Sequence, residues 1–402
     1  MIDFSVPPEI EQLCENVRAF MDEHVYPLER SGEHWTMEVG GPAFPPAVKA
    51  VQANAKAAGY WAFHLPKEAG GAGLPFMHYV FVNEILGRSP LAPICFGSQA
   101  PDSGNAEILW RFGTKEQKER WLKPLVNGDI RSCFSMTEPE VAGSDPRLLR
   151  TTAKRAGDYY VIDGHKWFSS GGHGASFAIV MAMTNPEAEN PYLRFSQIIV
   201  PTDTPGFNIA RGIPVMGDYD NHHSEIWYED CRVPVTNCLG GEGMGFAIAQ
   251  ERLGPGRIHH CMRWLGVAQR SFEMMCQYAT QREMFGSTLA QKANIQDWIA
   301  EARADIQAAR FLTLHAAWKI DTAGQKGARE EISLIKFFGA KVLLSVIDKA
   351  IQVHGAAGLT EDHPLSMFYR QSRAARIYDG ADEVHKMVVA RRILAQYEGK
   401  KR

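Results

Sequence analysis

The residues best suited to chemistry lie near the end of the chain, in the stretch Arg376-Ile377-Tyr378-Asp379-Gly380-Ala381-Asp382-Glu383-Val384-His385. The segments on either side have helical spacing, and the Asp-Gly pair interrupts them because glycine adopts backbone conformations that other residues resist. The interruption would hold the carboxylate of Asp379 at a helix end, beside an aromatic ring, where it could act as a base. An Asp-Gly pair is also a common turn, so both interpretations stay open on this stretch alone.

Composition restricts the class of protein. With 402 residues, 45% of them hydrophobic and 22% charged, the sequence is that of a globular protein with two or three structural units. A net charge of −3 gives no field that favours nucleic acid. No apolar run is long enough to span a bilayer, and neither end carries a recognisable targeting signal. Seven scattered cysteines indicate reduced thiols and a cytoplasmic location.

Histidine spacing argues against a metal site. His222-His223 and His259-His260 are adjacent pairs, whose side chains point to opposite or divergent faces. A metal needs ligands that converge on one point, so we expect none.

Three successive regions must position Asp379. Residues 1–130 are predicted to be a helical domain, with amphipathic spacing from Ile10 to Val25 and a capping-box pattern at Thr114-Lys115-Glu116-Gln117. Residues 131–240 are predicted to be an antiparallel β domain, since short strands follow one another without helices between them. These strands cover 159–162, 177–183, 195–200, 207–210 and 224–228.

Residues 241–402 are predicted to form a C-terminal four-helix bundle, which makes the fold class α+β. Long helical patterns run over about 258–281, 295–322 and 330–354, and a terminal helix follows the Asp-Gly pair. We expect Gly254-Pro255-Gly256 to interrupt the first of these helices. A Rossmann domain is disfavoured, because no glycine-rich run has the required spacing after a strand.

Five motifs, in order and at sensible separations, resemble those of the acyl-CoA dehydrogenase family over essentially the whole chain. They are Phe134–Pro139 with Ala142–Asp145, Gly164–Gly172, Gln281–Gly286, Gln352–Leu359 and Arg376–Gly380. The pairing of Gly254-Pro255-Gly256-Arg257-Ile258-His259-His260 with Tyr378–His385 looks closest to the branch that contains family members ten and eleven.

The resemblance implies bound FAD and the oxidation of an acyl-CoA thioester to its trans-2-enoyl form, as in the β-oxidation of fatty acids. A positioned carboxylate removes the α-proton while a hydride leaves the β-carbon for flavin N5. The family's base falls on Asp379, where most members have Glu. The shorter side chain must reach about one methylene further, and a misplacement of about 1 Å can cost ~10²-fold in rate. Some relatives carry the base near Gly256 instead, where this chain has no carboxylate, and Glu251 lies short of the matched position.

The resemblance also assigns binding roles. Flavin contacts fall on Phe134, Met136, Thr137, Trp167 and Ser169, with the Ser169 hydroxyl donating to flavin N5. Contacts to the remainder of FAD fall on Arg282, Phe285, Gln352, Gly355, Ala381 and Glu383. Substrate contacts fall on Ser144, Arg257, Tyr378 and Gly380.

Two of these residues concern the assembly. Arg282 and Phe285 would bind the FAD of a neighbouring subunit, which implies a homodimer or homotetramer. The resemblance further implies an electron-transferring flavoprotein as the acceptor, docking beside Trp167. Structural alternatives remain for these residues: a core strand, a buried tryptophan, and an arginine that compensates a helix dipole.

The sequence departs from the family pattern at the adenosine end. Ala293 and Ala356 stand where Gln and Gly are common, and Ala381 and Glu383 replace a hydroxyl and an amide. In the substrate region, Gly254 replaces the Asp that usually precedes the matched Arg257. Alternatives stay open. The resemblance to a branch with Asp as base implies, as one alternative, the elimination reaction of 4-hydroxyacyl-CoA through a 4-phosphoacyl intermediate, for which we expect a separate kinase. Another is an oxidase that uses oxygen. The departures at Ala293, Ala356 and Glu383 leave a third, a non-catalytic acyl-CoA-binding homologue.

Overall fold

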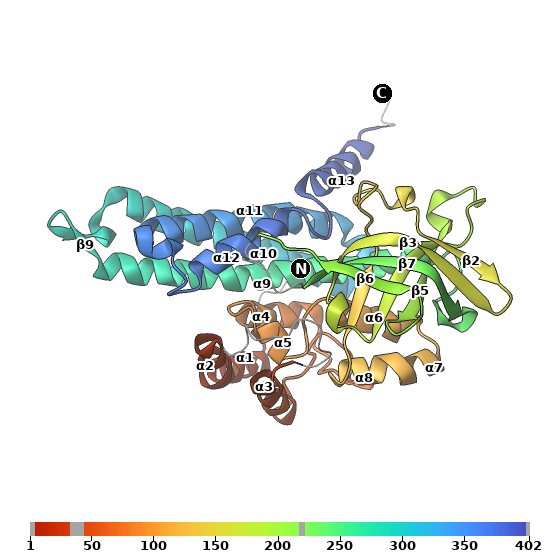
Figure 1. Cartoon of the computed structure of the whole chain (residues 1–402). Coiled ribbons are helices and arrows are strands. Elements are labelled where there is room, and N and C mark those ends of the chain that lie inside the picture. Colours follow the sequence, from red (N-terminus) through yellow and green to blue (C-terminus); the bar gives the residue numbers. More distant parts are fainter. Residues whose placement is uncertain (1–4, 33–43, 217–221, 399–402) are drawn as a thin grey trace. The chain divides into compact units, whose positions relative to one another are not determined.

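A computed structural model of the chain describes residues 5–32, 44–216 and 222–398 (Figure 1). Its elements follow the predicted order of helices, sheet and helices, which confirms the α+β fold class. They form two compact units. The helical unit comprises Met1–Tyr26, Pro75–Ala92 and Gly254–Arg402, and the mixed unit comprises Pro27–Leu74 and Pro93–Leu253. The three-part division at residues 130 and 240 stays a prediction.

The first part of the chain is helical, as predicted. Its helices are α1 (Pro8–Phe20), α2 (Tyr26–Ser31), α3 (Pro46–Ala57), α4 (Phe76–Leu86), α5 (Ala92–Cys95), α6 (Asp102–Phe112), α7 (Lys115–Gln117) and α8 (Lys123–Val126). The predicted capping box is confirmed before α7. The Thr114 hydroxyl accepts from the Gln117 amide at 3.2 Å, and the Gln117 side chain accepts from the Thr114 amide at 3.1 Å. Two otherwise unpaired donors at the helix start are thereby satisfied.

The mixed unit holds an eight-stranded sheet in the order β6-β7-β3-β2-β4-β5-β8, with β1 paired to β4. The strands are β1 (Ser132–Ser135), β2 (Thr152–Ala156), β3 (Tyr159–Ser170), β4 (Phe177–Met183), β5 (Phe195–Pro201), β6 (Phe207–Gly212), β7 (His223–Pro234) and β8 (Cys238–Leu239). Most pairs are antiparallel, as predicted, but β1 and β2 each pair with β4 in parallel. The chain reverses once in the β2–β3 hairpin and again between β3 and β4, so the parallel pairing could not be read from strand patterns.

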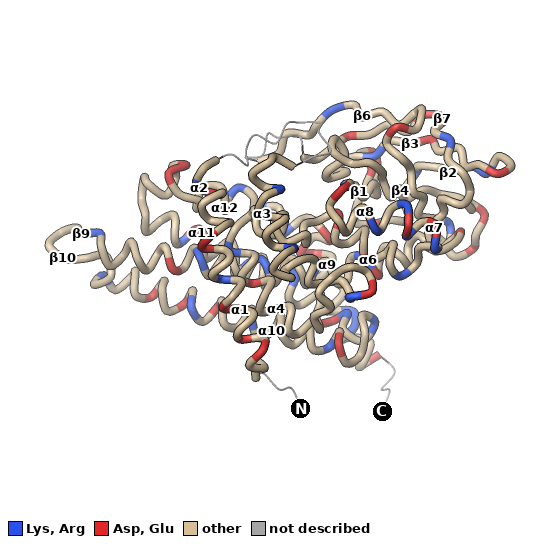
Figure 2. The backbone as a smooth tube through the Cα atoms, turned by 90° about the horizontal axis from the view of Figure 1, so that it is seen from below, with Lys and Arg blue, Asp and Glu red and all other residues tan. Residues whose placement is uncertain are grey.

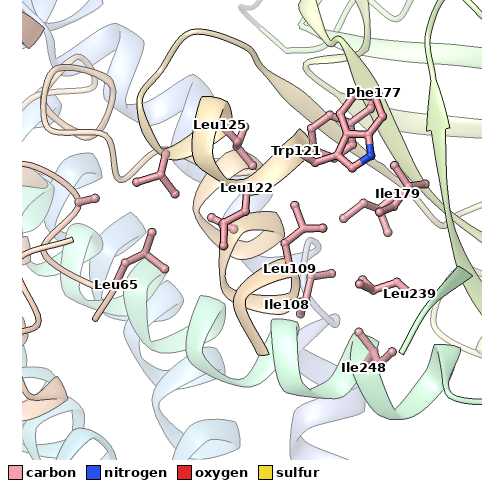
Figure 3. Close-up of a cluster of buried hydrophobic side chains, with 14 residues drawn as sticks. Leu65, Ile108, Leu109, Trp121, Leu122, Leu125, Phe177, Ile179, Leu239 and Ile248 are labelled. Carbon is pink, nitrogen blue, oxygen red and sulfur yellow. The ribbon is translucent and has the colours of Figure 1, made fainter. Parts of the chain in front are cut away.

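Strand β4 explains how the mixed unit builds its core. Successive strand side chains point to opposite faces, and both faces of β4 are buried. Phe177 and Ile179 join one hydrophobic cluster, together with Trp121 and Ile248 (Figure 3). Ala178, Val180 and Ala182 join a second cluster with side chains of β3 and β7. A continuous apolar run is therefore needed here, where a half-buried strand would alternate.

The helical unit is dominated by three long helices, α9 (Gly245–Gln281, which begins in the mixed unit), α10 (Ala293–Gly327) and α11 (Arg329–His354). A short hairpin, β9 (Glu283–Met284) and β10 (Ser287–Thr288), joins α9 to α10. Helices α12 (Leu365–Ser372) and α13 (Asp382–Ala395) complete the unit and pack against α11. Figure 1 shows α9, α10, α11 and α12 running side by side.

The expected interruption at Gly254-Pro255-Gly256 is wrong, because α9 continues through Pro255. Proline lacks a backbone N–H and so removes one hydrogen bond from a helix interior. A helix of 37 residues forms cooperatively on both sides of that gap and tolerates the loss. The consequence matters for the site, since residues 256 to 264 then share one continuous helical register.

The described residues show the mixed charge and the moderate hydropathy that the composition predicts. In Figure 2, basic and acidic positions intermingle along the drawn backbone of both units. None of the helices in the described ranges combines the length and the apolar character that crossing a membrane requires.

Candidate active site

Asp379 lies in a tight reversal between α12 and α13. After α12 a 3₁₀ turn covers Arg373–Arg376, and then Asp379 and Gly380 adopt φ values of +54° and +103°. Aspartate and glycine tolerate positive φ better than most residues. The predicted break in the helix is confirmed, and its conformation fixes where the Asp379 side chain starts.

Side chains from three helices hold the backbone of this turn. Arg257 Nε of α9 donates to the Asp379 carbonyl oxygen at 2.8 Å, and His385 Nε2 of α13 lies 3.1 Å from the same oxygen. From α11, the buried Lys336 Nζ donates to the carbonyl oxygens of Ala375 and Gly380 at 2.7 and 3.3 Å. The turn is therefore fixed on both sides of Asp379.

The Asp379 carboxylate faces α9. Its Oδ2 lies 3.3 Å from His260 Nε2, and a Cβ atom placed on Gly256 would lie 3.9 Å from the same oxygen. Residues four apart occupy one helix face, so Gly256 and His260 approach Asp379 together. The neighbouring His259 instead stacks on Phe76, with ring centroids 5.1 Å apart. The predicted divergence of this histidine pair is thus confirmed.

Positive charge exceeds negative charge around Asp379. Burial lowers the pKa of Arg257, Arg263 and Lys336, although the Asp379 carboxylate opposes the shift at each. Burial likewise lowers the pKa of His260, more than its hydrogen bond to the Asp379 carboxylate raises it. The pKa of His385 falls to about 4, mainly through burial and then through Arg257. Asp379 therefore lies among several cationic or potentially cationic groups.

Tyr378 packs on the same group of residues. Its ring centroid lies 4.7 Å from that of His260, and its hydroxyl accepts from Trp264 Nε1 at 2.9 Å. Burial raises the Tyr378 pKa, so the phenol stays neutral. Four predicted residues, Arg257, Tyr378, Asp379 and Gly380, are thus brought together within the helical unit.

The predicted flavin contacts Thr137 and Trp167 come together in the mixed unit. The Thr137 hydroxyl donates to the Trp167 carbonyl at 2.8 Å, and the Trp167 amide donates to the Thr137 carbonyl at 3.1 Å. A register shift between Lys166 and Ser169 interrupts the pairing of β3 with β7, and Phe168 within it has a φ of +51°. The irregularity re-aims Trp167, which stays half-buried.

The other residues predicted to contact the flavin surround this pair. The Ser169 hydroxyl is fully buried and lies 2.9 Å from that of Ser135, so its predicted bond to flavin N5 stays a prediction. Met136 O accepts from Lys166 Nζ at 2.7 Å, and the Phe134 ring lies beneath the Arg252 guanidinium at 4.1 Å.

Lys166 is buried and also pairs with Glu138 at 2.8 Å. Burial alone would raise the Glu138 pKa, but Lys166 and the hydrogen bonds from Thr151 outweigh it and hold the pKa low. This ion pair anchors the loop that carries Thr137.

The predicted nucleotide contacts Arg282 and Phe285 lie elsewhere in the helical unit. They belong to the hairpin after α9, where Phe285 has a φ of +49° and is 90% exposed. From His260 to the end of α9 the helix continues for some twenty residues, or roughly 30 Å at 1.5 Å per residue. Within one chain, the hairpin and Asp379 are therefore far apart.

The predicted contacts Gln352 and Gly355 lie near the hairpin end of α9. Tyr278 stacks on His354 with ring centroids 4.3 Å apart, which places the ends of α9 and α11 side by side. Ala381 caps the start of α13 and Glu383 is exposed in its first turn, where a carboxylate favours the helix dipole. Ser144 is exposed in the loop after β1.

The fold and these motifs together define a class: the chain belongs to the acyl-CoA dehydrogenase family. Models of the family's N-terminal, middle and C-terminal domains match residues 7–129, 133–231 and 243–394. The chain is 45% identical over 402 residues to "Probable acyl-CoA dehydrogenase FadE2" of Mycobacterium tuberculosis, covering 98% of each sequence.

Two further relatives support the predicted branch. The chain is 44% identical over 390 residues to acyl-CoA dehydrogenase family member 11 of Gallus gallus, covering 95% of this chain and 50% of that protein. Over 393 residues it is 42% identical to family member 10 of Mus musculus, covering 96% of this chain and 37% of that protein. It thus spans half or less of these two relatives. A solved structure from Mycobacterium abscessus matches with a TM-score of 0.93 and 42% identity, covering 98% of this chain and 100% of that one.

FAD is the cofactor of this family, and the residues present here fit it. The ladder of β1 with β4 ends at Ser135, and Met136 and Thr137 follow it. Their carbonyl oxygens accept from Lys166 and Trp167, so their amides are the backbone groups that would serve the polar edge of a flavin. Trp167 supplies an aromatic face beside them. These residues would hold the flavin ring.

Sequence reasoning missed His260. The spacing of His259 and His260 bears on metal ligation, and their divergence is confirmed, but the spacing alone gives His260 no place beside Asp379. The signal that could have found His260 is its spacing of four residues from Gly256, the alternative base position.

Proposed function

We propose that this chain oxidises an acyl-CoA thioester to trans-2-enoyl-CoA, with Asp379 as the base that takes the α-proton. The observation that carries this proposal is the position of the Asp379 carboxylate. It is held by a fixed turn against α9, and its Oδ2 lies 3.9 Å from the Cβ position of Gly256. The two base positions of the family thus converge on one point, although they come from different elements.

The chain's own residues give Asp379 what a base needs. Arg257, His385 and Lys336 hold the turn, so the carboxylate does not have to be ordered during the reaction. Surrounding positive charge favours the ionised form of a carboxylate. Bound FAD supplies the acceptor for the hydride that leaves the β-carbon.

The wider role follows from the same assignment. We propose a homodimer or homotetramer that passes electrons to an electron-transferring flavoprotein docking beside Trp167. The reduced state expected for its cysteines suits a cytoplasmic compartment. The chemistry suits the first oxidation step of fatty acid β-oxidation.

The test is anaerobic bleaching of the yellow protein by acyl-CoA. Asp379→Asn is expected to keep the colour and to lose bleaching by at least about 10³-fold, since the amide cannot accept the α-proton. Asp382→Asn is the matched control: this carboxylate pairs with Arg376 at 2.7 Å and should leave bleaching in place. An Asp379→Asn protein that bleaches at the normal rate contradicts the assignment. A protein purified gently without flavin would favour the non-catalytic alternative.

A second candidate, elimination from a 4-phosphoacyl-CoA, is favoured by the excess of positive charge. Arg263 Nη1 is buried without a hydrogen-bond partner among the described residues. A phosphate carries about −1.5 to −2 charge near neutral pH and pairs well with guanidinium groups. In this reaction, removal of the α-proton would be coupled to the release of phosphate.

Stoichiometric release of inorganic phosphate from a 4-phosphoacyl-CoA would decide between the two candidates. Arg263→Met should then weaken binding of the phosphorylated substrate and leave binding of the unsubstituted acyl-CoA nearly unchanged. Rapid bleaching by unsubstituted acyl-CoA, with no phosphate released from the 4-phosphoacyl-CoA, would exclude elimination.

A further inference from the structure

We propose that His260 is a positioning residue for Asp379: a neutral imidazole, oriented by Arg263, that donates a hydrogen bond from Nε2 to Asp379 Oδ2 and so orients the carboxylate that takes the α-proton. The proposal rests on the proposed function, because it gives His260 a task only if Asp379 is the base. It concerns a residue to which the family resemblance gave no role.

The protonation state of the ring follows from its two neighbours. Arg263 Nη2 lies 3.1 Å from His260 Nδ1, and a guanidinium group has donors only. Nδ1 must therefore accept, which leaves the proton of a neutral imidazole on Nε2. Nε2 lies 3.3 Å from Asp379 Oδ2, and a carboxylate accepts. The hydrogen bonds therefore run in one direction only, from Arg263 to His260 and from His260 to Asp379.

The surroundings keep the ring neutral. Burial lowers the His260 pKa, and the charges of Arg263 and Lys336 lower it further, against the opposing effect of Asp379. A second proton would also have to displace the Arg263 bond at Nδ1. His260 therefore acts as a donor and cannot replace Asp379 as the base.

The ring is also fixed in orientation. Tyr378 packs against it at 4.7 Å between centroids, and Trp264 lies on another side at 6.2 Å. Arg263 and Trp264 follow at the third and fourth positions after His260, which share its face of α9. One face of α9 thus carries His260 together with Arg263 and Trp264, two of the side chains that fix its ring.

The effect on Asp379 has two parts. A hydrogen bond to the ionised form stabilises the carboxylate, so the base stays ionised to lower pH. It also fixes the rotation of a side chain that is shorter than the glutamate most relatives use. Both parts are lost if the donor is removed.

Other groups act electrostatically on Asp379 or form hydrogen bonds with its backbone. Their titration also affects the pH dependence of the reaction. From the α9 face and the turn they are Arg257, Cys261, Arg263 and Tyr378, from α11 Lys336, and from α13 His385. Tyr79 of α4 acts on Arg263. All are retained when His260 alone is changed.

The experiment measures the pH dependence of anaerobic flavin bleaching at saturating acyl-CoA in the FAD-loaded protein. The rate falls on the acid side as the base takes up a proton. His260→Phe keeps a planar ring but has no donor, so we expect a rate about 10- to 100-fold lower and an acid limb displaced upward by about one pH unit. His260→Gln restores an N–H donor and should recover part of the rate, with the limb near its normal pH.

Two controls accompany these variants. His259→Phe changes the adjacent ring, which stacks on Phe76, and should leave the limb in place. The visible flavin spectrum and the FAD content of each variant exclude loss of folding as the cause.

A readout independent of activity tests the tautomer. In protein labelled with ¹⁵N-histidine, the His260 signals are those that vanish in His260→Gln. We expect them to report a proton on Nε2, and Arg263→Met should produce a mixture of both tautomers. A proton on Nδ1 in the unmodified protein would overturn the proposal.

The outcomes separate this proposal from the assignment of the base. Loss of bleaching in Asp379→Asn, with an unmoved limb and an unchanged rate in His260→Phe, overturns the role of His260 alone. Normal bleaching in Asp379→Asn overturns the base, and the positioning role with it. Disappearance of the limb in His260→Gln would mean that His260 itself titrates, which also contradicts the proposal.

Discussion

Asp379 and Gly256 approach the same point from different elements, so either element could carry the carboxylate that the proposed reaction needs. The Cβ position of Gly256 lies 3.9 Å from Asp379 Oδ2. A side chain from α9 could therefore present a carboxylate close to where Asp379 presents its own. Two adjacent carboxylates repel, so a negative charge at one position disfavours a negative charge at the other.

This geometry predicts a transplanted base. Asp379→Ala should abolish bleaching, and adding Gly256→Glu should restore about 1–10% of the original rate, since the new carboxylate starts from the right place but lacks the ordered turn. Gly256→Glu alone should lower the rate, because it places two carboxylates together. Stopped-flow bleaching of the three proteins measures this. If Asp379→Ala with Gly256→Glu is as inactive as Asp379→Ala alone, the convergence of the two positions is contradicted.

The sequence was sufficient to predict some residues of this site but not others. Asp379 and Arg257 belong to motifs, so the family resemblance located them. His260 does its proposed work through a hydrogen bond, which depends on how α9 is turned against the Asp379 loop. The sequence also suggested a break at Pro255, and a break there would have removed the common register of Gly256 and His260.

At the scale of elements, the α12–α13 turn is the feature that the site depends on most. Two positive φ angles in succession are costly unless the residues tolerate them. Gly380 has the more extreme value, +103°, and a Cβ atom there would lie 2.7 Å from His385 Nε2. Both conformation and space therefore require glycine at this position.

Gly380→Ala should consequently lower both stability and activity. We expect about 2 kcal/mol of destabilisation, seen as a lower Tm, and a lower bleaching rate because His385 and the Asp379 carbonyl must move. Gly157→Ala is the matched control, since Gly157 has a φ of +62° but nothing within 4 Å of the added Cβ. Thermal unfolding of both variants should separate the clash from the backbone strain. A Gly380→Ala protein that matches Gly157→Ala in both measurements would contradict this account.

Helices and strands could be predicted where the sequence pattern that determines them lies within a few neighbouring residues. The capping box at Thr114 and the apolar run of β4 determine their own structure. The register shift of β3 did not show in the sequence, because a bulge depends on pairing with a distant strand. In a regular strand, side chains two residues apart point to the same face, so Trp167 and Ser169 would be equally buried. Instead, Trp167 is half-buried and Ser169 is fully buried.

At the scale of the whole molecule, the open question is which chain the β9–β10 hairpin serves. Phe285 is 90% exposed, which is unusual for a large apolar side chain and suggests that it contacts something outside its own chain. The hairpin also lies roughly 30 Å along α9 from His260. A sequence motif names these residues but cannot say whether they act within a subunit or across an interface.

Mixed oligomers can answer this question. One subunit carries Asp379→Asn and an intact hairpin, and the other carries Arg282→Ala with Phe285→Ala and an intact base. Each homo-oligomer should be nearly inactive, the second because it binds FAD weakly. If the hairpin completes the FAD site of its neighbour, one site in each mixed dimer combines an intact base with an intact hairpin. Mixed dimers purified through two different tags should then recover up to about half of the normal rate per dimer.

The alternative arrangement predicts a different result. If each hairpin served its own subunit, every site in the mixed dimer would lack either the base or the hairpin, and no activity would return. Arg391→Ala, an exposed arginine on α13, serves as the control and should leave FAD content and activity unchanged. Flavin content measured alongside activity shows whether recovery reflects cofactor binding, since the rescued dimer should hold FAD in the site with the intact base.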